Sequence, residues 1–147
     1  MTGQMEIRAK NDLSEIERVS QFATEFGERV GLPERIIFAM NLALEEILVN
    51  IINYGYEDGG VHDIRVRLAI DGAGALVIEV EDDARPFDPT SMPDVDLEQS
   101  LEDRNIGGLG IHLVRTLFDD FEYHRREPHG NLLVLKKREP GATQPDV

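Results

Sequence analysis

The sequence predicts an α+β protein in which a mainly antiparallel sheet carries its helices on one face, a two-layer sandwich. Two observations support this fold class. Apolar residues recur with a helical period in some segments and with a period of two in others. Four of the alternating segments also form two pairs, each joined by a turn that can close a hairpin. The order along the 147 residues is strand, two helices, hairpin, long loop, helix and hairpin.

Turn-forming residues separate the expected elements. Gly31 with Pro33 ends the first helix, because glycine accepts a left-handed cap and proline cannot continue a helix. The runs 71–74 and 128–130 mark the two hairpin turns. Periodicity disappears between residues 84 and 106, which is typical of a functional lid or of a disordered segment, and we favour a lid. The expected elements are strand 5–9, helices 13–30 and 34–53, strands 62–70 and 75–81, helix 107–118, and strands 121–126 and 131–137.

Length and composition bound the organisation of the chain. A chain of 147 residues with 41% hydrophobic content can bury one core and is short for two. We therefore expect a single domain at 1–138, with the lid at 84–106, and a disordered tail at 139–147. Cysteine is absent, which excludes disulfides, zinc sites built on thiolates and a cysteine nucleophile.

The charge of the chain narrows the range of partners. The 15 Lys and Arg residues stand against 29 Asp and Glu residues, for a net charge of -14, and such a surface repels nucleic acid and anionic membranes. No apolar stretch of about 18 residues is uninterrupted, so we expect a soluble, cytoplasmic protein without a membrane partner. The acidity either attracts a basic protein partner or serves only solubility, and the sequence favours neither.

The second helix has a polar side that could hold a ligand. At about 100° per residue, Glu46, Asn50 and Asn53 fall on one side, opposite a broad apolar stripe. An amide oxygen is a suitable ligand for Mg²⁺, and a carboxylate one turn away can accept a proton from an attacking hydroxyl. The same pattern also fits an ordinary polar outer face, which is the better interpretation of this helix taken alone.

Two further segments have chemistry of their own. A strand runs into an acidic turn at Asp82, where a buried carboxylate would accept a hydrogen bond from the amine of adenine or, more simply, cap the turn. Glycines at 107, 108 and 110 lead into an apolar helix, so backbone N–H groups there could bind phosphate, although a flexible hinge is the simpler interpretation. The run lacks the Gly-Lys-Ser/Thr of a Walker A loop and the spacing of a dinucleotide-binding fingerprint.

Taken together and in this order, the three features resemble the N, G1 and G2 boxes of the GHKL superfamily of ATPases and kinases, which share the Bergerat or histidine-kinase-like ATPase fold. Residues 45–56, EEILVNIINYGY, are similar to the N box. Residues 82–89, DDARPFDP, look especially like the anti-sigma-factor serine/threonine-protein kinase branch. The resemblance covers roughly residues 5–138. It departs from the pattern at Ala84, where the wider superfamily has glycine, and at Ile106, where histidine kinases commonly have glycine.

The resemblance implies a site for ATP and Mg²⁺. Within that site Glu46 matches the catalytic general base, Asn50 the magnesium ligand and Asp82 the acceptor for adenine. Gly108 and Gly110 match the phosphate-binding glycines. The full set of expected nucleotide-binding residues is Asn50, Asn53, Asp82, Ala84, Pro86, Gly107, Gly108, Leu109, Gly110 and Ile111.

The resemblance also implies a function. We predict a serine/threonine-protein kinase that transfers phosphate from ATP to an anti-sigma-factor antagonist of the STAS type, and that sequesters a sigma factor when unphosphorylated antagonist is scarce. Kinases of this kind are commonly homodimers. Two alternatives stay open: a non-catalytic switch that binds a protein partner in an ATP-dependent way, and the detached catalytic domain of a histidine kinase.

Overall fold

The computed structural model describes residues 3–86, 106–126 and 130–138, with the backbone alone for residues 106–109. The predicted lid lies outside the described residues apart from its two ends, and so does the predicted tail. The elements follow the predicted order, and their ends agree to within about one residue, except that a short 3-10 helix precedes the first α-helix. They are β1 (Gln4–Lys10), η1 (Leu13–Glu15), α1 (Ile16–Val30), α2 (Glu34–Tyr54), β2 (Asp63–Ile70), β3 (Leu76–Asp82), α3 (Ile106–Leu117), β4 (Asp120–Arg125) and β5 (Asn131–Lys137).

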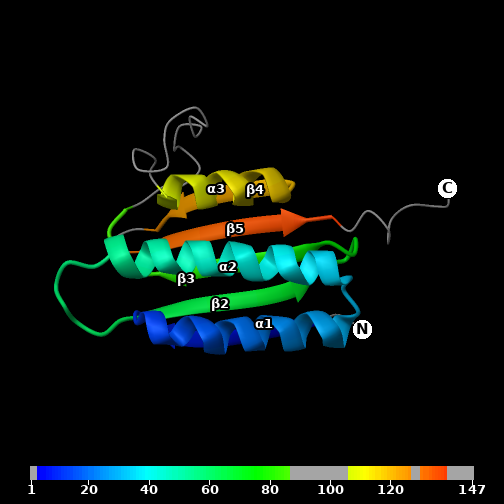
Figure 1. Cartoon of the computed structure of the whole chain (residues 1–147), viewed down its shortest axis with the longest axis horizontal. Coiled ribbons are helices and arrows are strands. Elements are labelled where there is room, and N and C mark those ends of the chain that lie inside the picture. The colour runs from blue at the N-terminus through cyan, green and yellow to red at the C-terminus, as the bar shows by residue number, and fades with distance from the viewer. Residues whose placement is uncertain (1–2, 87–105, 127–129, 139–147) are drawn as a thin grey trace.

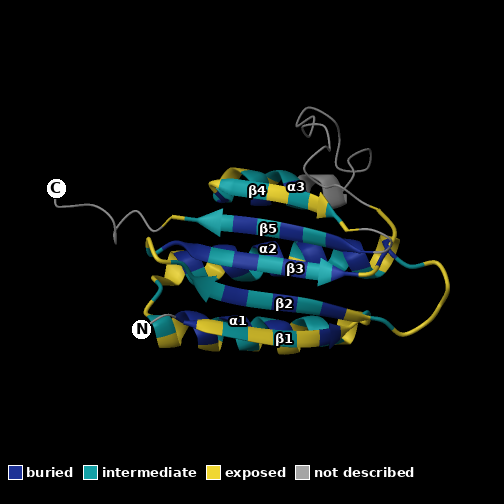
Figure 2. Cartoon of the chain, turned by 180° about the vertical axis from the view of Figure 1, so that it is seen from behind, coloured by how far each residue is buried: buried dark blue, intermediate teal, exposed yellow. Residues whose placement is uncertain are grey.

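The five strands form one antiparallel sheet in the order β1-β2-β3-β5-β4. Figure 1 shows α1, α2 and α3 on one face of this sheet, and Figure 2, from the opposite side, shows the other face without helices. The predicted α+β two-layer sandwich is confirmed. Because β5 enters the sheet between β3 and β4, Asp82 at the end of β3 lies opposite Asn131 at the start of β5.

Local hydrogen bonds define the ends of the first helical segment. Asp12 accepts a hydrogen bond from the backbone N–H of Ser14 at 2.9 Å and so begins η1. Glu15 turns its carboxylate back to the N–H of Lys10, also at 2.9 Å. Gly31, with a φ of 81°, closes α1 in the left-handed conformation that glycine adopts without strain, as the sequence predicts.

The core lies between the sheet and the helices. Alternate residues of β2, β3 and β5 are buried beneath the apolar sides of the helices. Among the described helices, α2 is long and apolar enough to cross a membrane by length and composition, with a mean hydropathy of 1.6, but half of that window is buried, as a core helix requires. The buried residues of α2 are Ile36, Ala39, Met40, Ala43, Leu44, Ile47, Leu48, Asn50 and Ile51. In this set, Asn50 alone is polar.

The face of the sheet without helices carries charged side chains. Arg65 pairs with Glu81 at 2.8 Å and Arg67 with Glu79 at 2.5 Å, both across β2 and β3. Glu6 of β1 lies 3.4 Å from Arg65. Such partly exposed pairs contribute little to stability individually.

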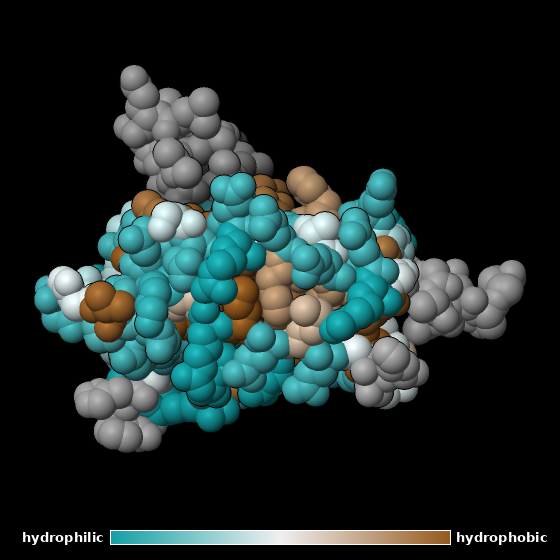
Figure 3. Space-filling view, turned by 90° about the horizontal axis from the view of Figure 1, so that it is seen from below, coloured by the Kyte–Doolittle hydropathy of each residue, from teal (hydrophilic) through white to brown (hydrophobic). Residues whose placement is uncertain are grey.

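Figure 3, seen from below, shows hydrophilic residues over much of the surface, with hydrophobic residues in small areas between them.

Candidate functional site

The predicted functional segments meet at one end of the sandwich. The C-terminal half of α2, the end of β3 and the start of α3 adjoin there (Figure 1), together with the start of β5. A mostly apolar pocket lies between these elements. It is lined by Ile47, Asn50, Ile51, Gly55, Asp82, Ala84, Arg85, Ile111, Asn131 and Leu133.

Asp82 is the buried carboxylate of this pocket, with only 6% of its surface exposed. Its Oδ1 atom accepts two hydrogen bonds, one from the backbone N–H of Ala84 and one from Nδ2 of Asn131, each at 2.8 Å. Burial raises the pKa of Asp82, while these two donors act in the opposite direction because they favour the ionised form. An ionised carboxylate can accept about four hydrogen bonds, so Asp82 retains the capacity to accept one from a ligand.

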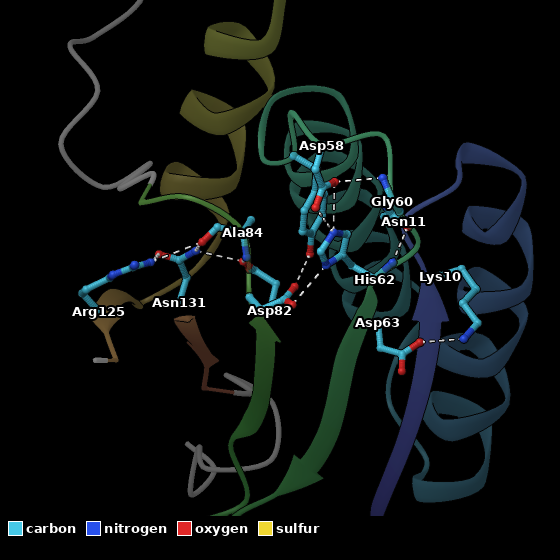
Figure 4. A network of polar contacts seen from close by, with 12 residues as sticks. Lys10, Asn11, Asp58, Gly60, His62, Asp63, Asp82, Ala84, Arg125 and Asn131 are labelled. Carbon is cyan, nitrogen blue, oxygen red and sulfur yellow. Dashed lines mark hydrogen bonds and ion pairs between the residues drawn. The ribbon is translucent and has the colours of Figure 1, made fainter. Parts of the chain in front are cut away.

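Asn131 is a pocket residue that the sequence analysis missed. It is buried, and its Nδ2 atom also reaches the carbonyl oxygens of Ala84 and Arg85, both at 3.1 Å. Figure 4 shows its side chain between Asp82, Ala84 and Arg125, where it ties β5 to the turn after β3. A signal for this role exists in the sequence, because positions 131, 133 and 135 of β5 face the core and Asn131 is the polar member of a series otherwise made of leucine.

α2 brings the predicted residues Asn50 and Glu46 to the same end of the fold. Asn50 is 5% exposed, and its Nδ2 atom has no hydrogen-bond partner in the described part of the chain. A buried amide left in this state costs roughly 1–3 kcal/mol, so its place in a pocket wall fits a residue that contacts a ligand. Glu46, one turn earlier, is partly buried. Burial, with a further contribution from the charge of Glu45, raises the pKa of Glu46.

A glycine allows α3 to pack against Glu46. A Cβ atom placed on Gly110 would lie 1.9 Å from Oε1 and 2.0 Å from Cδ of Glu46. The carboxylate therefore occupies the space that any side chain at position 110 would need. Glu46 thus lies against the N-terminal part of α3, at the fifth residue of that helix.

Ala84, which departs from the family pattern, packs directly against Gly55 on the other side of the pocket. A Cβ atom on Gly55 would lie 2.7 Å from the Cβ of Ala84 and 2.6 Å from the carbonyl oxygen of Ile51. Two side chains cannot share this space, so the buried methyl group of Ala84 fits because residue 55 is glycine.

The segment between α2 and β2 is fastened to the residue that follows Asp82. Asp83 accepts a hydrogen bond from the hydroxyl of Tyr56 and contacts Nδ1 of His62, both at 3.1 Å. The rings of Tyr56 and His62 stack with centroids 4.2 Å apart. Nε2 of His62 lies 2.9 Å from Oδ2 of Asp58 (Figure 4). The hydrogen bonds to Asp83 and then to Asp58 raise the pKa of His62. This arrangement holds the loop beside the pocket.

The structure gathers some of the predicted nucleotide-binding residues and separates others. Asn50, Asp82, Ala84 and Ile111 line the pocket. Asn53 and Pro86 are exposed and do not line it. Asn53 is about 60° around the helix from Asn50, which is enough to turn it from the pocket to solvent. Residues 107–109 form part of the first turns of α3, and the side chain of Leu109 lies outside the described part of the structure.

Comparison with known proteins identifies first the family of the chain and then individual relatives. A family model for the histidine kinase-like ATPase domain matches residues 9–137, and the chain belongs to this family. The serine-protein kinase RsbW of Halalkalibacterium halodurans is 26% identical over 140 residues, which are 92% of this chain and 82% of that protein. The serine/threonine-protein kinase BtrW of Bordetella bronchiseptica is also 26% identical over 140 residues, 90% of this chain and 97% of that protein. These matches confirm the predicted GHKL anti-sigma kinase branch and the predicted enzyme class, a protein serine/threonine kinase.

Solved structures confirm the fold. The RsbU and RsbW domains of Rv1364c from Mycobacterium tuberculosis match with a TM-score of 0.66 and 17% identity over 92% of this chain, which spans 32% of that protein chain. The histidine kinase domain of the blue-light activated histidine kinase from Erythrobacter litoralis matches with a TM-score of 0.57 and 14% identity. That match covers 85% of this chain and 59% of the other. The expected histidine-kinase-like ATPase fold is therefore present.

Proposed function

We propose that this chain phosphorylates an anti-sigma-factor antagonist of the STAS type on serine or threonine, using ATP and Mg²⁺. The observation that supports this proposal most is the pairing of two buried polar groups in one apolar pocket. Asp82 is a hydrogen-bond acceptor whose Oδ1 atom accepts from Asn131, and Asn50 has an Nδ2 atom without a hydrogen-bond partner among the described residues. The names of the two kinase relatives support the same reaction.

The pocket suits the adenine base. Ile47, Ile51 and Leu133 supply apolar walls against which a flat ring can pack. Asp82 offers a carboxylate to the exocyclic amine of the base, and a base that presents an oxygen at that position would meet repulsion instead. Recognition then comes from one polar contact in an otherwise apolar pocket.

The phosphates need favourable contacts because the chain is acidic. The start of α3 supplies backbone N–H groups and the positive end of a helix dipole. Within the described residues no three His, Cys, Asp or Glu side chains are grouped as a metal site, so Mg²⁺ would be held by Asn50 together with phosphate oxygens and water. The ion supplies neutralisation of phosphate charge and orientation of the transferring group.

Glu46 is the proposed general base. Its carboxylate lies at the start of α3, beside the proposed phosphate site, and its raised pKa makes it a better proton acceptor than an exposed glutamate. In this role it takes the proton of the attacking hydroxyl as the oxygen bonds to the γ-phosphorus. ADP then leaves with the electrons of the broken bond.

The biological setting follows from the family resemblance. We propose a cytoplasmic protein with an acidic surface that binds its antagonist, sequesters a sigma factor when unphosphorylated antagonist is scarce, and forms a homodimer. Residues 1–138 would form the single ATP-binding domain, with 84–106 as its lid.

The experiment measures transfer of the γ-phosphate of ATP to a purified STAS-type antagonist from the same genome. Glu46→Gln keeps the shape of the side chain and removes the base, so we expect ATP binding to persist and transfer to fall about 100-fold or more. Glu25→Gln, at an exposed glutamate of α1, is the matched control and is expected to retain transfer. Unchanged transfer in Glu46→Gln would exclude the proposed base. Acid-labile phosphate on the partner would favour the histidine-kinase alternative.

A further inference from the structure

The amide of Asn131 has a defined orientation. Its Oδ1 atom accepts hydrogen bonds from the hydroxyl of Tyr123 at 2.5 Å and from Nη1 of Arg125 at 3.3 Å. A guanidinium group donates hydrogen bonds and cannot accept them, so Oδ1 is the atom that must face Arg125. Nδ2 is therefore left to face Asp82, to which it donates at 2.8 Å.

The two donors come from β4, an edge strand that does not itself line the pocket. Arg125 pairs in register with Asn131, and Tyr123 with Leu133, so both side chains lie next to the start of β5. Arg125 also donates to the carbonyl oxygen of Ala84 at 3.3 Å. Through these hydrogen bonds, β4 holds Asn131 and Ala84 in the wall of the pocket.

The orientation of the Asn131 amide decides what Asp82 can do. With the NH₂ group toward it, Asp82 is stabilised as a carboxylate and accepts a hydrogen bond from a ligand. With the amide reversed, its oxygen would face Oδ1 of Asp82, so the carboxylate would lose a donor and gain a repulsive neighbour. A proton taken up there would be shared with the Asn131 oxygen, which leaves Asp82 a weaker, uncharged acceptor toward a ligand. The reversed orientation therefore discriminates less between a ligand amine and a ligand oxygen.

We propose that Tyr123 and Arg125 are positioning residues that set the preference of the site for a 6-aminopurine nucleotide over a 6-oxopurine nucleotide. They act by holding the Asn131 amide with its NH₂ group toward Asp82. The inference rests on the proposed function, because it requires that the pocket binds the base of a nucleotide.

The test compares calorimetric titrations with Mg-ATP and with Mg-GTP for the wild-type chain and two variants, Tyr123→Phe and Arg125→Met. Each variant keeps most of the side chain and removes the donor to Asn131. We expect the wild-type chain to bind ATP more tightly than GTP. We expect each variant to lower the ratio of the two affinities about tenfold, the effect of one lost buried hydrogen bond. Tyr54→Phe is the matched control, because the Tyr54 side chain is 54% exposed, and it keeps the wild-type ratio.

The affinity ratio separates positioning from a general loss of structure, since a loosened fold weakens both nucleotides together. A wild-type ratio in both variants, or equal losses for ATP and GTP, overturns this inference and leaves the proposed function intact. A control that shifts the ratio as far as Tyr123→Phe also overturns it. A wild-type chain that binds neither nucleotide overturns the inference and the proposed function together.

Discussion

Replacing Gly110 by alanine adds one methyl group at the point where α3 meets the Glu46 carboxylate. The added Cβ would lie 1.9 Å from Oε1 of Glu46, whereas ordinary van der Waals contact begins at 3.4 Å. Moving from 1.9 to 3.4 Å requires a displacement of about 1.5 Å, either of the carboxylate or of α3. The perturbation therefore acts directly on the position of the proposed general base.

We expect this displacement to slow phosphate transfer. A misplacement of about 1 Å can cost roughly a hundredfold in rate, so kcat for Gly110→Ala should fall on the order of a hundredfold. Backbone propensity works in the other direction, because alanine is favoured over glycine inside a helix by about 1 kcal/mol. A loss of activity would therefore not reflect a weaker helix.

The assay is single-turnover transfer of labelled phosphate to the antagonist, with ATP affinity measured separately. Gly72→Ala is the control, because a Cβ atom at Gly72 would meet nothing within 4 Å. In a Glu46→Ala background, Gly110→Ala should cause little further loss, since the colliding carboxylate is gone. A Gly110→Ala variant that binds ATP and transfers phosphate at the wild-type rate would refute the reasoning.

Three other changes have defined outcomes. Asp82→Asn should weaken ATP binding about 10- to 100-fold, because it removes a charged acceptor worth roughly 1.5–3 kcal/mol, and unchanged affinity in calorimetry would contradict that role. Gly55→Ala should lower the free energy of unfolding by about 1–3 kcal/mol through overpacking, since its Cβ would lie 2.6 Å from the Ile51 carbonyl oxygen. An unchanged midpoint of urea unfolding would contradict this predicted overpacking. The hydrogen bonds of His62 to Asp83 and Asp58 raise its pKa, so their contribution to stability is full below a pH of about 6.5 and is lost as the pH rises through the raised pKa. The stability difference between wild type and His62→Asn should therefore shrink as the pH rises above about 6.5, and a difference that does not change with pH would show that protonation of His62 does not stabilise the loop.

Most of the fold could be predicted because its signals are local. The helices and strands have clear hydrophobic periods, and residues such as Gly31 end them through backbone conformations that few other residues adopt. The order of the strands could not be predicted in this way. β5 lies between β3 and β4, and that position depends on pairings between segments far apart in the sequence, such as Asp82 with Asn131.

The residues of the candidate site show the same difference between local and long-range signals. Glu46, Asn50 and Asp82 were identified because each lies in a short segment that resembles a family box. Asn131 lies outside those segments, and its contact with Asp82 joins residues 49 positions apart. Helical geometry alone also placed Asn53 beside Asn50, but the structure exposes Asn53 because the pocket occupies a narrow sector of α2.

The central claim is that this pocket binds ATP with Mg²⁺ through Asp82 and Asn50. Its most direct test is calorimetric titration of ATP, with and without Mg²⁺, into the wild-type chain and into the Asp82→Asn and Asn50→Asp variants. We predict magnesium-dependent binding to the wild-type chain and strongly weakened binding to both variants. A hundredfold excess of ATP over its dissociation constant should also stabilise the wild-type fold by about 2.7 kcal/mol. No binding at millimolar ATP, or equal binding by all three proteins, would contradict the account.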